Sequence, residues 1–123
     1  MKVMVFVKTI SETQAGVKRN VDEHAARAAM DAYNDELVKA GIRLDVAGLT
    51  PISKGARISF SGEKAIVIDG PFTESKELVA GFWIWQVRSM QEAIEWAKRC
   101  PLPDGVANAI ELRPFNEADD TAS

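Results

Sequence analysis

The chain has 123 residues, of which 46% are hydrophobic and 27% charged, and its net charge is -3. This length and composition indicate one soluble domain with its own core, and the small negative charge argues against non-specific nucleic-acid binding, which needs clustered lysine and arginine. The single cysteine, Cys100, excludes an internal disulfide and fits a reducing cytoplasm.

The first predicted element is a strand from Lys2 to Lys8, because β-branched and aromatic residues dominate there. Its apolar run is too short for a signal peptide or a membrane span, so we expect a cytoplasmic protein without a membrane partner. Residues 9–20 are polar and long for a connection, which predicts a mobile flap or a disordered link.

A helix is predicted from Val21 to Ala40, because apolar residues recur there at helical spacing and Gly41 supplies the usual end. The recurring residues are Ala26, Met30, Tyr33 and Leu37. His24, the only histidine, shares a different stripe with Asp31 and Asp35. We expect His24 to face solvent, and a catalytic role is the alternative, because its ordinary pKa is near neutrality.

Three further strands follow this helix. Residues 42–51 read as a strand that ends at a proline, and residues 56–70 contain two alternating runs with Gly62 between them, which predicts a hairpin. Leu78 to Arg88 is rich in aromatic and β-branched residues and is predicted to be another strand.

A second helix is predicted to begin after Ser89. Glu92 stands three positions after this serine, which is the capping-box pattern, and Pro101 ends the helix. Residues 109–115 are predicted to form the last strand, and residues 116–123 an acidic, unfolded tail.

The order β-α-β, hairpin, β-α-β predicts a single α+β domain over residues 1–115, a ferredoxin-like sandwich whose antiparallel sheet carries two helices on one face. The strand before the second helix is apolar on both of its faces. Val79, Gly81, Trp83, Trp85 and Val87 are predicted to point one way, and Ala80, Phe82 and Ile84 the other. Because helices cover only one face, we expect a homodimer with sheets packed face to face.

The run from Val67 to Pro101, "VIDGPFTESKELVAGFWIWQVRSMQEAIEWAKRCP", resembles the signature of DGPF-domain proteins, within the YCII-related family of dimeric α+β barrels. "AYNDELVKAGIRLDVAGLTP" and "IELRPF" are similar to the family's first helix, second strand and last strand, so the resemblance spans Lys2 to about Phe115. It implies the ferredoxin-like fold and a sheet-to-sheet dimer.

The resemblance implies less about function. Family members are mostly uncharacterised; some relatives take part in degrading small aromatic or chlorinated compounds, and some occur with extracytoplasmic-function sigma factors. Shorter members are thought to use a His and Asp pair near the first helix. His24 lies too far upstream of Gly41 to match that histidine, so the pair is not carried over to this chain.

Four charged residues are candidates for a site. Asp69 precedes Gly and Pro and either anchors the turn or acts as a general acid or base at a pocket mouth. Lys76 and Glu77 either belong to a solvated surface, or serve a dimer contact, or Lys76 holds an anionic substrate with Glu77 as its ion-pair partner. Arg113 either clamps a carboxylate or pairs with Glu111 or Asp69.

Aromatic residues supply the other candidates. Tyr33 is expected to present its hydroxyl to a cleft between helix and sheet, where a fold of this kind would bind a small molecule. Trp83 and Trp85 are expected to lie in the core or a dimer interface, with an aromatic-accepting pocket as the alternative.

The chain shows no Ser-His-Asp order, metal-ligand cluster or phosphate-binding glycine loop, so no cofactor or metal is expected. Two function classes remain. One is a dimeric small-molecule-binding enzyme of lyase, isomerase or hydrolase type, with Asp69 as acid or base. The other is a non-catalytic dimeric regulatory or interaction module, which the resemblance connects with sigma-factor-dependent transcription.

Overall fold

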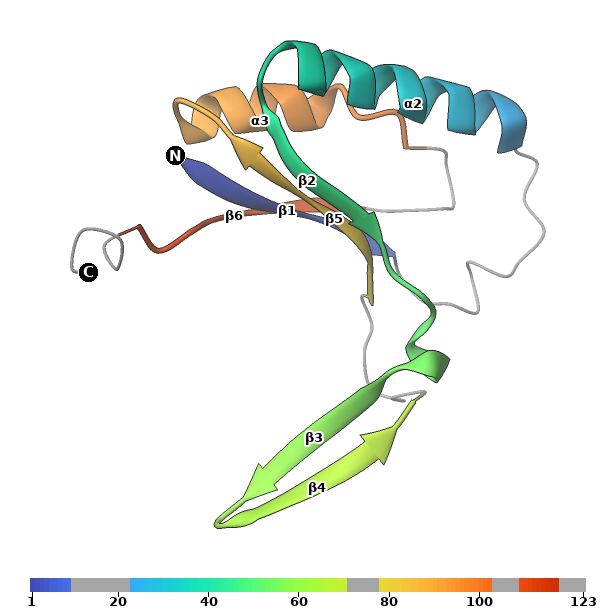
Figure 1. Cartoon of the computed structure of the whole chain (residues 1–123), viewed down its shortest axis with the longest axis vertical. Helices are drawn as coiled ribbons and strands as arrows, with labels where there is room; N and C mark the ends of the chain where they lie inside the picture. The colour runs from blue at the N-terminus through green and yellow to red at the C-terminus, as the bar shows by residue number, and fades with distance from the viewer. Residues whose placement is uncertain (10–22, 71–77, 103–108, 118–123) are drawn as a thin grey trace.

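The computed structural model describes residues 1–9, 23–70, 78–102 and 109–117 (Figure 1). Its elements are β1 (Lys2–Thr9), α2 (Glu23–Lys39), β2 (Arg43–Gly48), the 3-10 helix η1 (Ile52–Lys54), β3 (Ala56–Ser61), β4 (Lys64–Asp69), β5 (Leu78–Gln86), α3 (Met90–Lys98) and β6 (Ala109–Pro114). The predicted strands and helices are all present. The predicted connection after β1 and the predicted tail fall almost entirely outside the described residues.

Four strands form one antiparallel sheet in the order β2-β5-β1-β6, and β3 and β4 form a separate hairpin. Helices α2 and α3 lie side by side on one face of the sheet (Figure 1). This is the predicted ferredoxin-like α+β fold, with the hairpin inserted between β2 and β5. Neither described helix is long and apolar enough to cross a bilayer.

The core lies between the helices and the sheet, because alternate residues of the two central strands point toward α2 and α3. Its buried cluster consists of Val3, Val5, Tyr33, Leu37, Ile42, Trp83, Trp85, Val87 and Ala93. The helix stripe predicted from the sequence supplies two of these residues, and partly buried Met30 packs against them.

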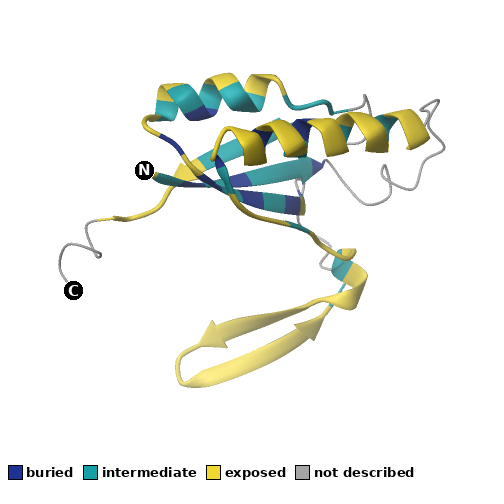
Figure 2. Cartoon of the chain, turned by 45° about the horizontal axis from the view of Figure 1, so that its top comes forward, coloured by how far each residue is buried: buried dark blue, intermediate teal, exposed yellow. Residues whose placement is uncertain are grey.

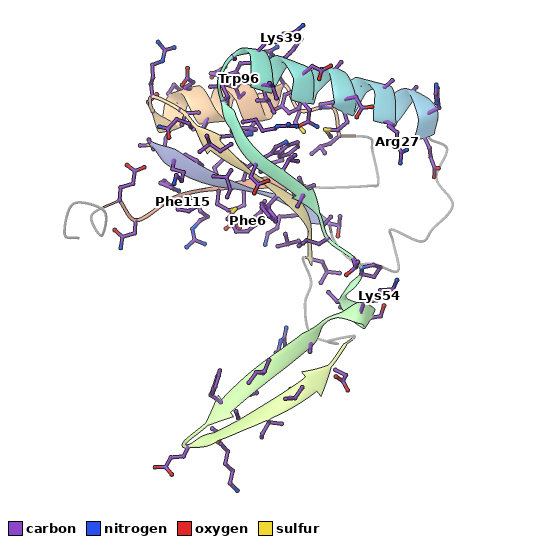
Figure 3. The ribbon with its side chains drawn as sticks, in the orientation of Figure 1. Phe6, Arg27, Lys39, Lys54, Trp96 and Phe115 are labelled. Atoms are coloured by element: carbon purple, nitrogen blue, oxygen red, sulfur yellow. The ribbon has the colours of Figure 1, made fainter. Side chains whose placement is uncertain are left out.

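The face of the sheet away from the helices, called the open face below, is apolar in its centre. Its central residues are half-buried: Met4, Phe6, Phe82 and Ile84. Figure 3 shows Phe6 on this side. The β6 side of the open face is charged and carries Lys8, Glu111 and Arg113. An apolar centre with a charged rim is the composition of a protein interface.

One strand departs from the predicted alternation. Gly81 pairs with Val7, but Val79 pairs with Lys8, so β5 carries one extra residue at this point. A bulge of this kind moves all residues beyond it to the other face. As a result Leu78 is buried, and the prediction that Val79 points the same way as Gly81 is wrong.

Helix α2 is terminated, as predicted, by Gly41, which follows its last turn and has a φ of +72°. The N–H of Ile42 donates to the carbonyl of Leu37 at 2.9 Å, and the N–H of Gly41 donates to that of Val38 at 3.0 Å. These two bonds make a Schellman motif, which needs a left-handed residue and therefore favours glycine. Ile42 and Leu37 both belong to the core, so this end of the helix is fixed against the sheet.

Helix α3 begins with a modified capping box. The Ser89 hydroxyl accepts from the Glu92 N–H at 3.2 Å, as predicted. The Glu92 carboxylate accepts from the N–H of Arg88 at 2.7 Å, one residue before the cap, and also binds the Arg88 guanidinium. These bonds, the backbone bond first, hold the pKa of Glu92 below its usual range.

Strands β3 and β4, called the arm below (residues 56–69), stand away from the rest of the domain. Every residue of both strands is exposed (Figure 2). The predicted turn at Gly62 is present, with φ +63°, as tight two-residue turns require. In Figures 1 and 2 the arm extends on the side of the sheet opposite the helices.

Candidate functional site

A cavity of about 230 Å³ lies between α2 and the sheet. It is lined by Val7 of β1, Met30 and Asn34 of α2, Val46, Ala47 and Gly48 of β2, and Ala80, Gly81, Phe82 and Trp83 of β5. The lining is almost wholly apolar. The cleft predicted between helix and sheet is therefore present, at the end of the sheet where β2 runs out and β5 begins.

The cavity has one fixed polar group on α2. The indole Nε1 of Trp83 donates to Oδ1 of Asn34 at 2.8 Å, and Nδ2 of Asn34 donates to the carbonyl of Met30 at 3.2 Å. These bonds set the orientation of the amide and leave its second N–H as a donor. Asn34 and Trp83 carry the only polar side-chain atoms among the described lining residues.

Two glycines, which form one cross-strand pair, shape the floor of the cavity. A Cβ at Gly81 would lie 2.8 Å from the carbonyl oxygen of Ala47, so this position has no room for a side chain. A Cβ at Gly48 would meet nothing within 4 Å. The missing side chain of Gly48 therefore helps to keep the cavity open.

Tyr33 is adjacent to Asn34 in sequence but faces a different way. Its hydroxyl donates to the carbonyl of Trp96 at 2.7 Å, and its ring meets Trp83 edge-on at 5.9 Å. Burial raises the pKa of Tyr33, so the phenol remains neutral. The hydroxyl is thus engaged with α3, and the lining of the cavity does not include Tyr33.

The two predicted tryptophans of β5 have different positions. Trp83 lines the cavity, whereas Trp85 is fully buried in the core. The rings of Trp96, Tyr33, Trp83 and Trp85 are in successive contact, with centroids 6.4, 5.9 and 5.9 Å apart. The Nε1 of Trp85 has no hydrogen-bond partner among the described residues, which is rare for a buried donor.

Asp69 lies outside the cavity. It is the last residue of β4, exposed at the base of the arm. Next to it, the N–H of Gly70 donates to the carbonyl of Gly55 at 3.0 Å, and a Cβ at Gly70 would lie 1.7 Å from the Ile52 carbonyl oxygen. The glycine thus lets the chain pass close to η1. Lys76 and Glu77 lie in residues 71–77, which the structure does not describe.

His24 and Arg113 are also remote from the cavity. His24 is exposed in the first turn of α2, as predicted. Arg113 contacts the Glu111 carboxylate at 3.3 Å, and Glu111 also lies 3.7 Å from the Lys8 ammonium. The predicted contact between Arg113 and Glu111 is therefore present, on the open face. The candidates that lie in the described residues, Tyr33, His24, Asp69 and Arg113, do not form one constellation.

The residues that sequence reasoning missed are Asn34 and Gly48. Asn34 stands next to Tyr33 and four positions after Met30, which was a usable helical-spacing signal. Gly48 gave no signal, because the space above it depends on how α2 packs. Within the described ranges, no group of three or more histidine, cysteine, aspartate or glutamate residues is placed to hold a metal ion.

Comparison with known proteins gives the family. Residues 1–116 match the YCII-related domain. An uncharacterized protein of Rhizobium meliloti (strain 1021) is 33% identical over 94 residues, which cover 76% of this chain and 75% of that protein. The fold resembles that of a 5-chloro-2-hydroxyhydroquinone dehydrochlorinase from Burkholderia phenoliruptrix AC1100, solved in complex with 2,5-dihydroxybenzoquinone, with TM-score 0.52, 16% identity and 94% coverage of both chains. Because the YCII-related domain matches residues 1–116, the chain belongs to the family of proteins with this domain.

Proposed function

We propose that this domain binds a small, flat, largely apolar molecule in the cavity between α2 and the sheet. The main support for this proposal is the cavity itself, whose described lining is apolar apart from the Asn34 amide and the Trp83 indole N–H. Pockets for drug-sized ligands measure about 300–1,000 Å³, so a volume of about 230 Å³ suits a molecule the size of a single ring.

The polar groups favour a ring that carries oxygen. The second N–H of the Asn34 amide is a donor for a carbonyl or hydroxyl oxygen, and the Trp83 ring offers a flat surface for stacking. A hydroxylated quinone has both features. The dehydrochlorinase with a similar fold was solved with such a molecule, which supports the choice of ligand class.

The described lining favours binding over acid-base turnover. None of the described residues around the cavity has a titratable side chain, and Asp69 lies at the base of the arm. General acid-base catalysis needs such a group within hydrogen-bond reach of the reacting atom. We therefore leave Asp69 out of the proposed site.

The same proposal includes a homodimer formed through the open face. Phe6 and Phe82 at its centre are only half-buried within one chain, although the burial of such side chains is strongly favourable. A second copy supplies an identical apolar surface, and twofold pairs are the commonest assemblies of soluble proteins.

The cavity is tested by filling it. Gly48→Leu places a side chain in open space, because nothing lies within 4 Å of its Cβ position and its φ is not positive. We expect wild-type protein to bind 2,5-dihydroxybenzoquinone or another hydroxylated six-membered ring in isothermal titration calorimetry. The variant should bind at least about tenfold more weakly, since a ligand and a leucine cannot share the volume.

The matched control is Thr50→Leu, a leucine two residues away at an exposed position outside the cavity. It should bind as the wild type does. Absence of binding across a panel of hydroxylated benzenes and quinones, or equal affinity in Gly48→Leu and wild type, would refute the proposal.

A further inference from the structure

The arm has two unlike faces. Residues directly opposite in an antiparallel pair share a face, and residues alternate between faces along each strand. The pairing therefore gathers Ala56, Ile58, Phe60, Ala65, Val67 and Asp69 on one face. The other face carries Arg57, Ser59, Ser61, Lys64, Ile66 and Ile68. The first set, called the apolar face of the arm below, has Asp69 at its base as its only polar member.

No described part of the chain covers this apolar face. The exposed fractions are 78% for Phe60, 64% for Val67 and 47% for Ile58. A two-stranded hairpin without further packing is at best marginally stable in water. Large apolar side chains gathered on one exposed face mark an interaction site.

The position of the arm indicates what covers it. The arm extends on the side of the sheet that the helices leave free, which is also the side of the open face (Figures 1 and 2). One chain thus has two uncovered apolar surfaces on the same side. Any molecule seated on the open face lies beside the arm as well.

We propose that the arm is a clasp for a second copy of this chain, with its apolar face packed on the partner while the two open faces meet. This rests on the dimer included in the proposed function and adds a second contact to it. A twofold pair makes every contact twice, so each arm holds the other chain and one partner covers both surfaces.

The charges are compatible with this arrangement. The apolar face of the arm ends in a carboxylate, Asp69, while the β6 side of the open face has two cations, Lys8 and Arg113, around the single carboxylate of Glu111. Opposite charges of this kind fix the register of an interface. A second copy therefore meets the open face with the matching sign.

The test uses neighbouring positions on one strand. Ile58→Asp and Phe60→Asp place a charge on the apolar face, whereas Ser59→Asp and Ser61→Asp place the same charge on the other face. We expect sedimentation equilibrium to show a dimer of the wild type and of the serine variants. The dissociation constant of the Ile58→Asp and Phe60→Asp variants should be raised at least about a hundredfold. All four positions are exposed in the single chain, so circular dichroism should show the same fold throughout.

Hydrogen exchange then locates the contact. Amides of residues 56–69 should be protected above the dissociation constant of the dimer and exchange rapidly after dilution below it. Concentration-independent protection would mean that the arm packs on its own chain and would overturn the proposal. A monomeric wild type, or a dimer of equal strength in Phe60→Asp, would do the same.

Failure of this proposal is distinguishable from failure of the proposed ligand site. The cavity lies on the helix side of the sheet, so Phe60→Asp should leave the affinity for the quinone probe unchanged. Loss of dimerisation with retained ligand binding supports the clasp. A dimer that depends on the arm and binds no ring compound refutes the ligand site and leaves the clasp in place.

Discussion

Gly48 and Gly81 face each other across β2 and β5, yet the space around them differs. At Gly81 a Cβ would lie 2.8 Å from a backbone oxygen, which cannot move aside without shifting β2. At Gly48 the same atom would meet nothing. One cross-strand pair therefore combines a position where glycine is required for packing with one where it leaves room.

We predict that Gly81→Ala lowers the free energy of unfolding by about 1–3 kcal/mol, the usual cost of overpacking. Gly48→Ala is the matched control and should be close to neutral, because its Cβ position is unobstructed. Urea unfolding followed by circular dichroism measures both. Equal stabilities for the two variants would contradict the close approach at Gly81.

At this scale the sequence predicted the cleft between helix and sheet, but a pocket position for Trp83 was only the alternative to core or dimer interface, and the rest of the lining was not predicted. The helical stripe identified Met30 and Tyr33, and the structure turns the Tyr33 hydroxyl to Trp96 while Asn34 faces the cavity. Which of two adjacent helix residues lines a cavity depends on how the helix is rotated about its axis relative to the sheet. That rotation is a property of packing and is not encoded in local spacing.

At the N-terminus of helix α3, one carboxylate makes both a backbone and a side-chain contact. Glu92 accepts the backbone N–H of Arg88 and binds its guanidinium, while Ser89 accepts the N–H of Glu92. The carboxylate also lies in the first turn, where the helix dipole favours negative charge. Both contacts are stronger with the ionised form.

The lowered pKa of Glu92 predicts a pH-dependent contribution to stability. Because the pKa in the folded state is below that in the unfolded state, the contribution is complete above the ordinary glutamate pKa of about 4.3. It is lost as the pH falls through the lower folded value. Urea unfolding should find Glu92→Gln less stable than wild type at pH 7, and the gap should narrow as the pH falls through that lower folded value.

Glu95→Gln is the control on the same helix, since Glu95 contacts only Gln91 and Lys98 among the described side chains. Its difference from wild type should be smaller at pH 7. A gap for Glu92→Gln that stayed constant at every acidic pH at which the protein remains folded would contradict the role of the ionised carboxylate.

Features with a local sequence signal were predicted correctly, whereas the irregular register between β1 and β5, which depends on pairing, was not. Gly41 and Ser89 act within a few residues of their own helices, so their caps were readable. The bulge in β5 arises from the register against β1, and the local sequence of β5 does not indicate it. The strand was therefore predicted correctly and the facing of Val79 incorrectly.

For the whole molecule, a strand that is apolar on both of its faces predicted that something must cover the side of the sheet without helices. The described helices lie on one face only, and the centre of the other contains Met4, Phe6, Phe82 and Ile84. The hairpin was also predicted, but not its projection from the domain. Alternation within β3 and β4 is equally compatible with packing on the sheet of its own chain.

We predict that Phe6→Asp raises the dissociation constant of the homodimer at least about tenfold, because it places a charge at the centre of the open face. Val38→Asp is the control, an exposed apolar residue on α2, on the other side of the molecule. Sedimentation equilibrium compares the two variants after circular dichroism has verified their folds. A folded Phe6→Asp variant that associates as tightly as Val38→Asp would refute dimerisation through this face.

The contacts among Trp96, Tyr33, Trp83 and Trp85 unite the chain's one tyrosine and all three of its tryptophans in a single group. At these separations, light absorbed by the tyrosine passes to an indole before it is emitted. The folded protein therefore fluoresces as a tryptophan protein, and the tyrosine emission appears only when the core comes apart. Since Trp83 forms a wall of the cavity, we expect the same emission to change when the proposed quinone binds there.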